Sequence, residues 1–278
     1  MSHPIPSPPD NIAFIGGGNM ASAIIGGLIK RGMPAADIQV IEPFSEQRDK
    51  LRKQFGVQAE EKPSDSLAKA RMVVWAVKPQ TFKEAAMLAR DYTKAAVHLS
   101  VAAGIRSDSI ALWLGTDCVV RSMPNTPALV GKGITALFAR KAVNVADRLA
   151  VEAVIQTTGE FLWLDDEAQL DAVTALSGSG PAYVFYFIES MIEAGVDMGL
   201  TREQAHKLAV ATFVGSAALA ESSDDPPEIL RARVTSKGGT TYAALTSLEQ
   251  DHVKNLFIRA MHAARQRAHE LGDEFGAA

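Results

Sequence analysis

The stretch Asn11–Ala21, NIAFIGGGNMA, decides how the first half of this chain folds. Its apolar residues 12–15 predict a short buried strand, which three glycines then interrupt. Apolar residues at helical spacing follow, at Met20, Ile24 and Leu28. A strand, a glycine turn and a helix in this order predict a dinucleotide-binding unit, with pyrophosphate at the positive end of the helix. The plainer alternative is an ordinary tight turn between a strand and a helix.

The small residues of this turn each have a steric reason. Gly16 lets the chain turn sharply out of the strand, and Gly18 leaves no side chain between the backbone and a phosphate. Ala21 takes the third small position, where helix and strand pack closely. Because the context fits on both sides of the turn, we favour cofactor binding over a plain turn.

Apolar runs and amphipathic segments alternate as far as residue 123. We expect strands at 12–15, 38–41, 72–77, 97–101 and 118–122, and helices at 45–55, 81–92 and 107–114. This alternation predicts an α/β fold with a doubly wound parallel sheet of Rossmann type. Two further strands, at 133–140 and 160–164, flank a helix at 146–156 and extend the same sheet.

Ligands of such sheets lie beyond the carboxyl ends of the strands. Those ends are expected at Gly16–Gly18, Glu42–Pro43, Ala76–Pro79, Val101–Gly104 and Met123–Pro127.

Strand patterns end near residue 166, and the rest of the chain is expected to be helical. The helical patterns lie at 167–176, 180–199, 201–220, 227–234, 240–248 and 252–271. We therefore expect a disordered lead-in at 1–10, a Rossmann-type domain at 11–164 and an all-α domain at 165–278.

The expected helix at 180–199 is apolar around most of its circumference, so more than one neighbour must bury it. The next helix has small residues on its inner face: Ala205, Ala209, Thr212, Gly215 and Ser216. These patterns favour a bundle shared between subunits of a homo-oligomer, and a self-contained bundle is the alternative.

Composition and charge exclude several classes of protein. The chain has 278 residues, a net charge of −4 and a pI near 5.9, which give no broad positive field for nucleic acid. Its one cysteine, Cys118, permits no internal disulfide and suits a reducing compartment. The N-terminus lacks the features of a signal peptide, and residues 182–198 carry too many acidic groups for a membrane span. We expect a cytoplasmic protein without a nucleic-acid or membrane partner.

The histidines show no metal-ligand spacing, so no metal is expected. His98, inside an expected strand, is interpreted as a packed core residue, and Cys118 as a small buried hydrophobe rather than a reactive thiol.

Two glycine-rich segments of the helical half have no simple packing explanation in the sequence. They are SGSGPA at residues 177–182 and TSKGGTT at residues 235–241. Each precedes a helical pattern, where hydroxyls, free backbone N–H groups and the helix dipole can hold a carboxylate or phosphate. Plain N-capping is the alternative for either segment. The second is richer in hydroxyls, so we favour it as the site of the substrate anion.

At these residues the chain resembles pyrroline-5-carboxylate reductase, and the resemblance extends from residue 12 to about 271. The motifs that carry it are FIGGGNMASAI, WAVKPQ, SVAAGI, VVRSMPNTPALVGKGITAL, LSGSGPAYVFYFIESMIEAGVDMGL and VTSKGGTTYAAL. The first two are shared with other reductases of the wider fold. MPNTP, SGSGPAY and SKGGTT in this order are more specific.

The resemblance implies hydride transfer from NAD(P)H to the C=N bond of 1-pyrroline-5-carboxylate, which gives L-proline in the last step of proline biosynthesis. It also implies a homodimer or a ring of dimers with interlocked helical domains. In such an assembly the substrate loop of one subunit completes a site that includes the cofactor domain of another.

The resemblance also implies roles for individual residues. Ser236, Gly239 and Thr240 would hold the substrate carboxylate, and Thr241 would hydrogen-bond the ring nitrogen as the catalytic residue. The cofactor would lie against Ile15, Gly16, Gly17, Gly18, Asn19 and Met20 at its pyrophosphate, Ala76, Val77, Lys78 and Pro79 on its adenosine side, and Val101, Ala102, Ala103 and Asn125 near the nicotinamide. A protonated imine already accepts hydride well, so orientation and charge complementarity matter more than a strong acid. Lys78 is therefore expected to contribute its backbone alone.

The chain departs from the family pattern at three places. Lys237 replaces a common proline, and Arg233 stands where many relatives carry asparagine. Glu42 and Pro43 stand where NADPH-using members often offer an uncharged polar residue and an arginine. An acidic side chain there accepts hydrogen bonds from a ribose 2′-OH and repels a 2′-phosphate, although Arg48 could still reach such a phosphate. The family favours NADPH, and Glu42 keeps NADH open.

Two other functions compete with the proline-forming reductase. One is a related imine reductase or hydroxy-acid dehydrogenase, but residues 182–199 lack the lysine that usually marks the latter. The other is a non-catalytic dinucleotide-binding protein, against which the intact SKGGTT loop argues.

Overall fold

A computed structural model describes residues 8–276 of the chain. The predicted disordered lead-in at 1–10 lies outside the described residues as far as residue 7. The described chain forms two compact units. The first runs to Ser179 and resumes at Ala264, and the second spans Gly180–Ala263.

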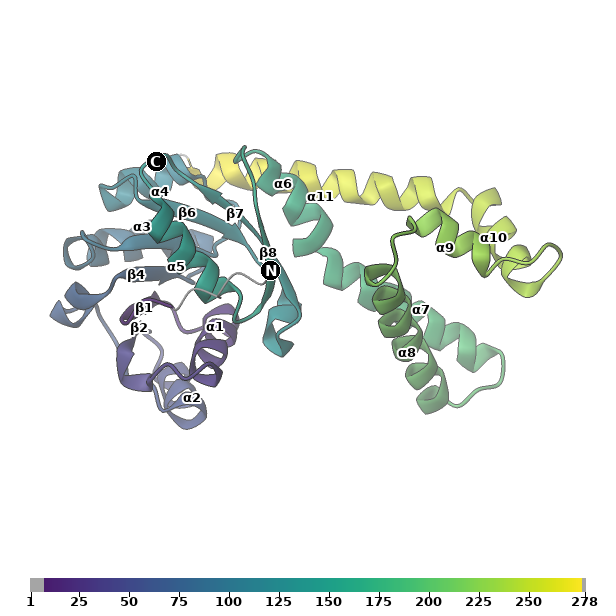
Figure 1. The fold of residues 1–278 in the computed structure, drawn as a ribbon, viewed down its shortest axis with the longest axis horizontal. Coiled ribbons are helices and arrows are strands. Elements are labelled where there is room, and N and C mark those ends of the chain that lie inside the picture. Colours follow the sequence, from purple (N-terminus) through teal and green to yellow (C-terminus); the bar gives the residue numbers. More distant parts are fainter. Residues whose placement is uncertain (1–7, 277–278) are drawn as a thin grey trace. The chain divides into compact units, whose positions relative to one another are not determined.

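The first unit is built on an 8-stranded sheet with the order β3-β2-β1-β4-β5-β6-β7-β8 (Figure 1). The strands are β1 (Ile12–Ile15), β2 (Ile38–Ile41), β3 (Ala59–Glu60), β4 (Met72–Trp75), β5 (Val97–Ser100), β6 (Val119–Met123), β7 (Gly133–Ala139) and β8 (Gly159–Trp163). Neighbours are parallel except for β6 and β7. The strand order reverses at β1, which creates a crevice at the carboxyl ends of β1 and β4. The predicted doubly wound Rossmann-type sheet is confirmed.

The sequence reasoning missed two features of this sheet. The strand β3 has 2 residues, too few for a periodic pattern to show. The strand β7 runs antiparallel to β6, because the connection at residues 124–132 is too short for the crossover that a parallel neighbour requires.

Helices cover both faces of the sheet (Figure 1). They are α1 (Asn19–Lys30), α2 (Ser45–Phe55), α3 (Pro79–Ala89), α4 (Ser107–Leu114), α5 (Val145–Ile155) and α6 (Gln169–Val173), and a π-helix (Thr174–Gly178) follows α6. The predicted bounds of α2 and α4 are confirmed. The helix α3 starts two residues before its predicted start, because Pro79 fits the first helical turn.

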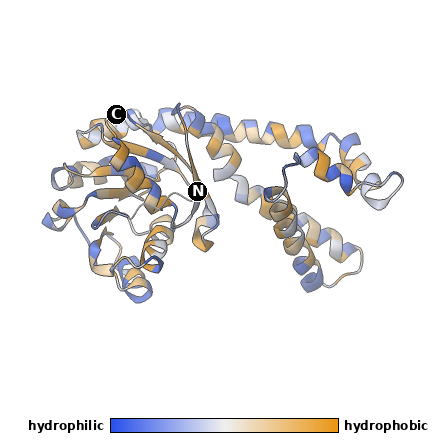
Figure 2. Cartoon of the chain, viewed as in Figure 1, coloured by the Kyte–Doolittle hydropathy of each residue, from blue (hydrophilic) through white to orange (hydrophobic). Residues whose placement is uncertain are grey.

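Each face of the sheet has its own hydrophobic core, because side chains alternate along a strand. Phe14 points to the core shared with α1, α2 and α5, and Ile15 points to the core shared with α3 and α4. In the second of these cores Trp75 and Phe82 are fully buried, with ring centroids 5.1 Å apart. Figure 2 colours the strands as hydrophobic along much of their length.

The last helix, α11 (Val253–Gly276), contributes its final turns to the first unit. Phe275 packs against the core on the α3 and α4 side of the sheet. A Cβ atom at Gly104 would lie 3.1 Å from the Cβ atom of Leu271. The last turns of α11 therefore pack closely against the loop that follows β5.

The second unit consists of α7 (Gly180–Asp197), α8 (Arg202–Glu221), α9 (Pro227–Arg233), α10 (Thr240–Gln250) and the first part of α11. The helices α7 and α8 pack side by side around Ile192, Ala205 and Ala209 (Figure 1). Phe257 of α11 packs on Phe187 of α7, with ring centroids 5.7 Å apart.

Much of the apolar surface of this unit is exposed in the single chain. Phe185 of α7 is 63% exposed. Of the small residues predicted on the inner face of α8, Ala205 and Ala209 are buried, while Thr212, Gly215 and Ser216 are exposed. Within residues 8–276, no helix is both long and apolar enough to cross a membrane.

Candidate active site

The glycine turn leaves β1 with a geometry that only glycine tolerates at its first position. Gly16 has a φ of 95°, and a Cβ atom there would lie 2.6 Å from the carbonyl oxygen of Ala76. Its N–H donates to the carbonyl of Ile41 at 2.8 Å. The turn is thus fixed between the carboxyl ends of β2 and β4.

Gly18 has a different reason to be glycine. It is the N-cap of α1 with a φ of −68°, which any residue adopts, and a Cβ atom there would meet nothing within 4 Å. Neither strain nor packing inside the protein requires a glycine here. The open space lies at the positive end of α1, where a pyrophosphate fits against the backbone. The residues present therefore fit a dinucleotide cofactor.

The backbone N–H of Gly17 is already engaged by an acidic side chain. It donates to Glu42 Oε2 at 2.8 Å, and the N–H of Phe44 donates to Glu42 Oε1 at 2.9 Å. Glu42 is 6% exposed and follows β2 directly. The phosphate donors left at the turn are therefore the N–H groups of Gly18, Asn19 and Met20 in the first turn of α1.

Arg48, a possible ligand of a 2′-phosphate, is held by backbone oxygens. Its Nη1 atom donates to the carbonyls of Glu42 at 2.9 Å and Pro43 at 2.7 Å. Sequence reasoning missed Gln47, whose Nε2 atom donates to the carbonyl of Gly17 at 2.5 Å. No local pattern distinguishes Gln47 from an ordinary exposed helical residue, because its partner lies 30 positions earlier.

The other predicted cofactor residues follow β4, β5 and β6, whose carboxyl ends share one edge of the sheet with the glycine turn. They are Ala76, Val77, Lys78 and Pro79 after β4, Val101, Ala102 and Ala103 after β5, and Asn125 after β6. Lys78 is exposed at the N-cap of α3. Asn125 is 9% exposed, and its Oδ1 atom accepts the N–H of Ile134 at 3.0 Å. This bond fixes the amide so that its NH₂ group remains available as a donor.

His98 and Cys118 are structural residues. His98 is 1% exposed, and its Nδ1 atom accepts a hydrogen bond from Trp75 Nε1 at 3.0 Å. This burial confirms the interpretation of His98 as a packed core residue, and it lowers the pKa of the imidazole from 6.5 to about 4. Cys118 is only partly buried, so its predicted burial is not complete. Desolvation and the nearby Asp147 carboxylate still raise the pKa of its thiol to about 11, so it is a poor nucleophile at neutral pH.

The first glycine-rich segment passes close to the end of β6 at Gly178, while a Cβ atom at Gly180 would meet nothing within 4 Å. A Cβ atom at Gly178 would lie 2.3 Å from the Cε atom of Met123, at the end of β6. Ser177 lies in the π-helix, and its hydroxyl donates to the carbonyl of Val173 at 3.2 Å. Because the Cε atom of Met123 is the flexible end of the methionine side chain, the contact brings Gly178 close to β6 but does not by itself require a glycine.

The second segment, residues 235–241, forms the turn before α10 in the second unit. The N–H of Gly239 donates to the carbonyl of Ser236 at 2.9 Å, and Gly239 is the N-cap of α10. Thr240 and Thr241 open the helix. Within residues 8–276, the hydroxyls of Ser236, Thr240 and Thr241 have no hydrogen-bond partner. Hydroxyls and first-turn N–H groups are thus free to bind an anion together.

The two departures near this loop differ in their contacts. Arg233 Nη1 lies 2.5 Å from Asp225 Oδ2, so the arginine pairs across α9 with the preceding loop. Lys237 is exposed in the turn itself.

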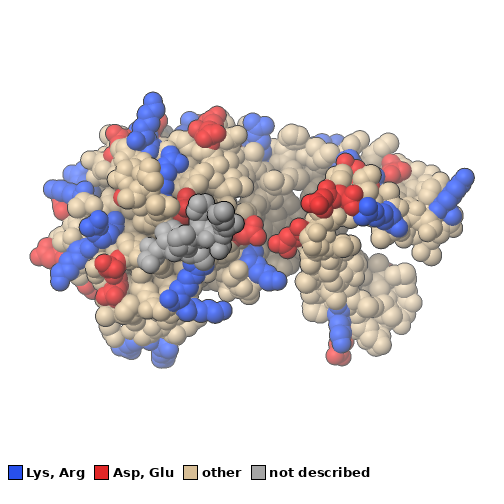
Figure 3. Space-filling model, viewed as in Figure 1, with Lys and Arg blue, Asp and Glu red and all other residues tan. Residues whose placement is uncertain are grey.

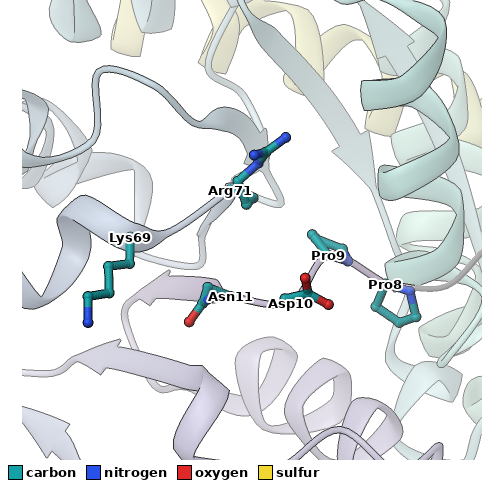
Figure 4. A pocket seen from close by; sticks show the side chains of 6 residues that line it. All are labelled: Pro8, Pro9, Asp10, Asn11, Lys69 and Arg71. Carbon is teal, nitrogen blue, oxygen red and sulfur yellow. The ribbon is translucent and has the colours of Figure 1, made fainter.

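A shallow hollow of about 460 Å³ lies away from these residues. It is lined by Pro8, Pro9, Asp10, Asn11, Lys69 and Arg71, at the amino ends of β1 and β4 (Figure 4). This is the edge of the sheet opposite the glycine turn, so the hollow is separate from the candidate cofactor site. Figure 3 shows acidic and basic side chains interspersed over the visible face of the molecule. Among the described residues, no group of three His, Cys, Asp or Glu side chains could hold a metal ion.

Comparisons with known proteins agree with this arrangement. A family described as pyrroline-5-carboxylate reductase dimerisation matches residues 167–271, and one described as NADP oxidoreductase coenzyme F420-dependent matches residues 11–104. Pyrroline-5-carboxylate reductase from Pseudomonas aeruginosa is 45% identical over 95% of this chain and 98% of its own length.

Two solved structures are similar over nearly the whole chain. A pyrroline-5-carboxylate reductase from Coxiella burnetii has a TM-score of 0.87 and 38% identity, and it covers 94% of this chain and 98% of its own. Pyrroline carboxylate reductase from Plasmodium falciparum, solved with NADP bound, has a TM-score of 0.84 and 30% identity, with the same coverage of 94% and 98%.

Proposed function

The chain belongs to the pyrroline-5-carboxylate reductase family, and on this premise we propose that it reduces 1-pyrroline-5-carboxylate to L-proline, the last step of proline biosynthesis. The observation that carries the proposal is that the similarity is continuous from the glycine turn through the loop at 235–241. A related imine reductase or hydroxy-acid dehydrogenase, or a non-catalytic dinucleotide-binding protein, is not favoured.

The cofactor is NAD(P)H, which supplies the hydride when it is bound. The N–H groups of Gly18, Asn19 and Met20 donate to its pyrophosphate from the first turn of α1. Residues 76–79, 101–103 and Asn125 line the rest of the crevice, with the backbone of Lys78 in place of its side chain.

The substrate is an anion with a C=N bond, and the loop before α10 has the groups to hold it. Ser236 and Thr240 bind the carboxylate through their hydroxyls, together with the free first-turn N–H groups at the positive end of the helix. Gly239 caps the helix at this point without a side chain, and its own N–H is held by the carbonyl of Ser236. The hydroxyl of Thr241 hydrogen-bonds the ring nitrogen and orients the imine carbon. Because a protonated imine is already electrophilic, this orientation replaces a dedicated strong acid.

Glu42 influences the relative affinity of this chain for NADH and NADPH. Its carboxylate is held rigidly by the N–H groups of Gly17 and Phe44, beside the expected ribose position. A ribose 2′-OH can donate to it, while a 2′-phosphate meets a fixed negative charge. The family supports NADPH, and Glu42 supports NADH.

The chain is a homo-oligomer, as its dimerisation family indicates. The functional boundary is proposed near residue 164. Cofactor binding lies before it, and substrate binding and dimerisation lie after it. The match to the dimerisation family, which begins at residue 167, supports this boundary. A cytoplasmic location is proposed, since the lone Cys118 suits a reducing compartment.

The direct test follows the oxidation of NADPH and of NADH by absorbance in the presence of 1-pyrroline-5-carboxylate. We expect turnover with at least one cofactor and L-proline as the product. The ratio of kcat/KM for the two cofactors then measures the influence of Glu42. Binding of either cofactor without turnover would support the non-catalytic alternative, and turnover restricted to another imine would support a related reductase.

A further inference from the structure

The peptide group between Gly17 and Gly18 is held by a side chain that no pattern in the sequence distinguishes. We propose that Gln47 is a positioning residue for the cofactor, because it aims the N–H of Gly18 at the pyrophosphate. This inference deepens the cofactor site and rests on the proposed function.

The peptide bond between Gly17 and Gly18 is planar. The carbonyl of Gly17 and the N–H of Gly18 belong to one trans peptide, so they point in opposite directions. Gln47 Nε2 donates to that carbonyl at 2.5 Å. Holding the oxygen toward α2 therefore directs the N–H of Gly18 away from α2. The space beside Gly18 is open, because a Cβ atom there would meet nothing within 4 Å.

Glycine on both sides makes this peptide unusually free to rotate. A flip of the peptide would exchange the positions of the N–H and the C=O, and it needs only changes in backbone angles that glycine tolerates. The flipped carbonyl would present a partial negative charge to a pyrophosphate, which is unfavourable. The hydrogen bond from Gln47 opposes this flip. The only other polar contact of the Gly17 oxygen within residues 8–276 is with the hydroxyl of Ser22, at a longer 3.4 Å.

The structure also fixes the neighbouring peptide and the helix that carries Gln47. Glu42 holds the N–H of Gly17, so the peptide before the proposed one is already anchored. Leu51 lies one helical turn after Gln47 and is 1% exposed in the first core. Its Cδ1 atom is 2.7 Å from the position of a Cβ atom at Gly17, so α2 and the turn are in close contact. Gln47 is therefore presented to the turn by a well-anchored helix.

The test compares Gln47→Met with Gln54→Met in the full-length chain. Methionine keeps the length of the side chain and removes the donor. Gln54 is the matched control because it is exposed on the same helix. Affinities for NADH and NADPH are measured by the fluorescence of the bound nicotinamide, and kcat is measured at saturating cofactor and 1-pyrroline-5-carboxylate.

We expect Gln47→Met to raise the dissociation constants of both cofactors by about fivefold to tenfold, the cost of one misdirected donor. Its kcat at saturation and its KM for the imine should stay within about twofold of the wild type, and its melting temperature should match that of Gln54→Met. A second variant, Gln47→Glu, keeps the shape of the side chain but cannot donate a hydrogen bond when ionised. It should therefore raise the dissociation constants of both cofactors at least as much.

Several outcomes would overturn the inference. They are unchanged cofactor affinity in Gln47→Met, an equal loss in Gln54→Met, or a loss of kcat with affinity intact. A wild-type chain that binds NADH but does not reduce the imine would contradict the proposed function alone, since the affinities still test Gln47. A wild-type chain that binds neither dinucleotide would overturn both.

Discussion

The two compact units of this chain bury their apolar residues to very different extents. In the first unit Phe14, Trp75 and Phe82 are fully buried between the sheet and its helices. In the second unit the buried apolar cluster contains only Ile192, Ala205 and Ala209 among the described residues. A sheet offers each helix a broad apolar face, while two neighbouring helices cover only one stripe of each other.

The difference shows which unit is complete in one chain. Large apolar side chains of the second unit are exposed, and they include Phe185 at 63%, Tyr186 at 67% and Met198 at 78%. Large apolar side chains exposed in this number mark an interface between proteins. The dimerisation family that matches here points to a second copy of the chain as the partner for this surface.

The largest expected effect is on self-association through the exposed apolar side chains of the second unit. Phe185→Glu should weaken self-association by more than ~100-fold, because a two-fold interface loses the buried ring twice and would bury two charges. Leu112→Glu is the matched control on α4 of the first unit, where Leu112 is 66% exposed. Light scattering or sedimentation gives the mass of each variant. If Phe185→Glu keeps the wild-type mass at low concentration, the second unit is not completed through this face of α7.

A second prediction concerns the closed core of the first unit. The pKa of His98 is lowered from 6.5 to about 4 in the folded chain. Between these pH values the imidazole is therefore protonated in the unfolded chain and neutral in the folded chain. The free energy of unfolding should therefore fall as the pH falls from 6.5 to about 4, by up to about 3 kcal/mol in total.

Urea unfolding at several pH values measures this slope, and His98→Gln should flatten it. An equal slope in the wild type and His98→Gln would mean that water reaches His98 and that the first core is more open than the structure shows.

The third prediction separates the chemistry of the two units. Thr241→Ala should lower kcat by roughly 10-fold to 100-fold, the cost of one hydrogen bond to a charged group. Its affinity for NAD(P)H should stay within about twofold. The control is Thr246→Ala on the same helix, because that hydroxyl donates to the carbonyl of Tyr242. Loss of cofactor affinity in Thr241→Ala would show that this loop has a different role.

The smallest expected effect is on cofactor affinity in the first unit, whereas the previous variant affects kcat through the second unit. Gly18→Ala should weaken NAD(P)H binding by roughly tenfold, because the new methyl group enters the space proposed for the pyrophosphate. Stability should be unchanged or slightly higher, since the φ of −68° suits alanine. Gly16→Ala offers the contrast, because it should destabilise the fold through its clash with Ala76. Unchanged affinity in Gly18→Ala would exclude close approach of a phosphate at this residue.

Local signals in the sequence predicted much of the fold and part of the candidate site. The bounds of α2 and α4 were predictable because Gly56 and Gly115 end these helices in the left-handed conformation. The strand β3 was not predictable, because two residues are too few to form a pattern. The antiparallel direction of β7 was missed, although the short connection at residues 124–132 requires it.

Side-chain partners of the glycine turn were the hardest to predict. The sequence places Glu42 at the end of a strand but does not show that Gly17 occupies its carboxylate. It gives no sign of Gln47 at all. The last turns of α11 also pack on the first unit, where Arg106 Nη2 donates to Asp273 Oδ1 at 2.5 Å, although they follow the helical half in the sequence.

The sequence by itself determined the strand, glycine turn and helix at Asn11–Ala21, the alternation that makes a Rossmann-type sheet, and the family. These depend on periodicity and on backbone angles, which neighbouring residues set locally. Only the tertiary structure decided which N–H groups of the turn remain free, why Gly16 must be glycine beside Ala76 and which apolar faces stay uncovered. These depend on contacts between segments far apart in the chain, and no local pattern encodes them.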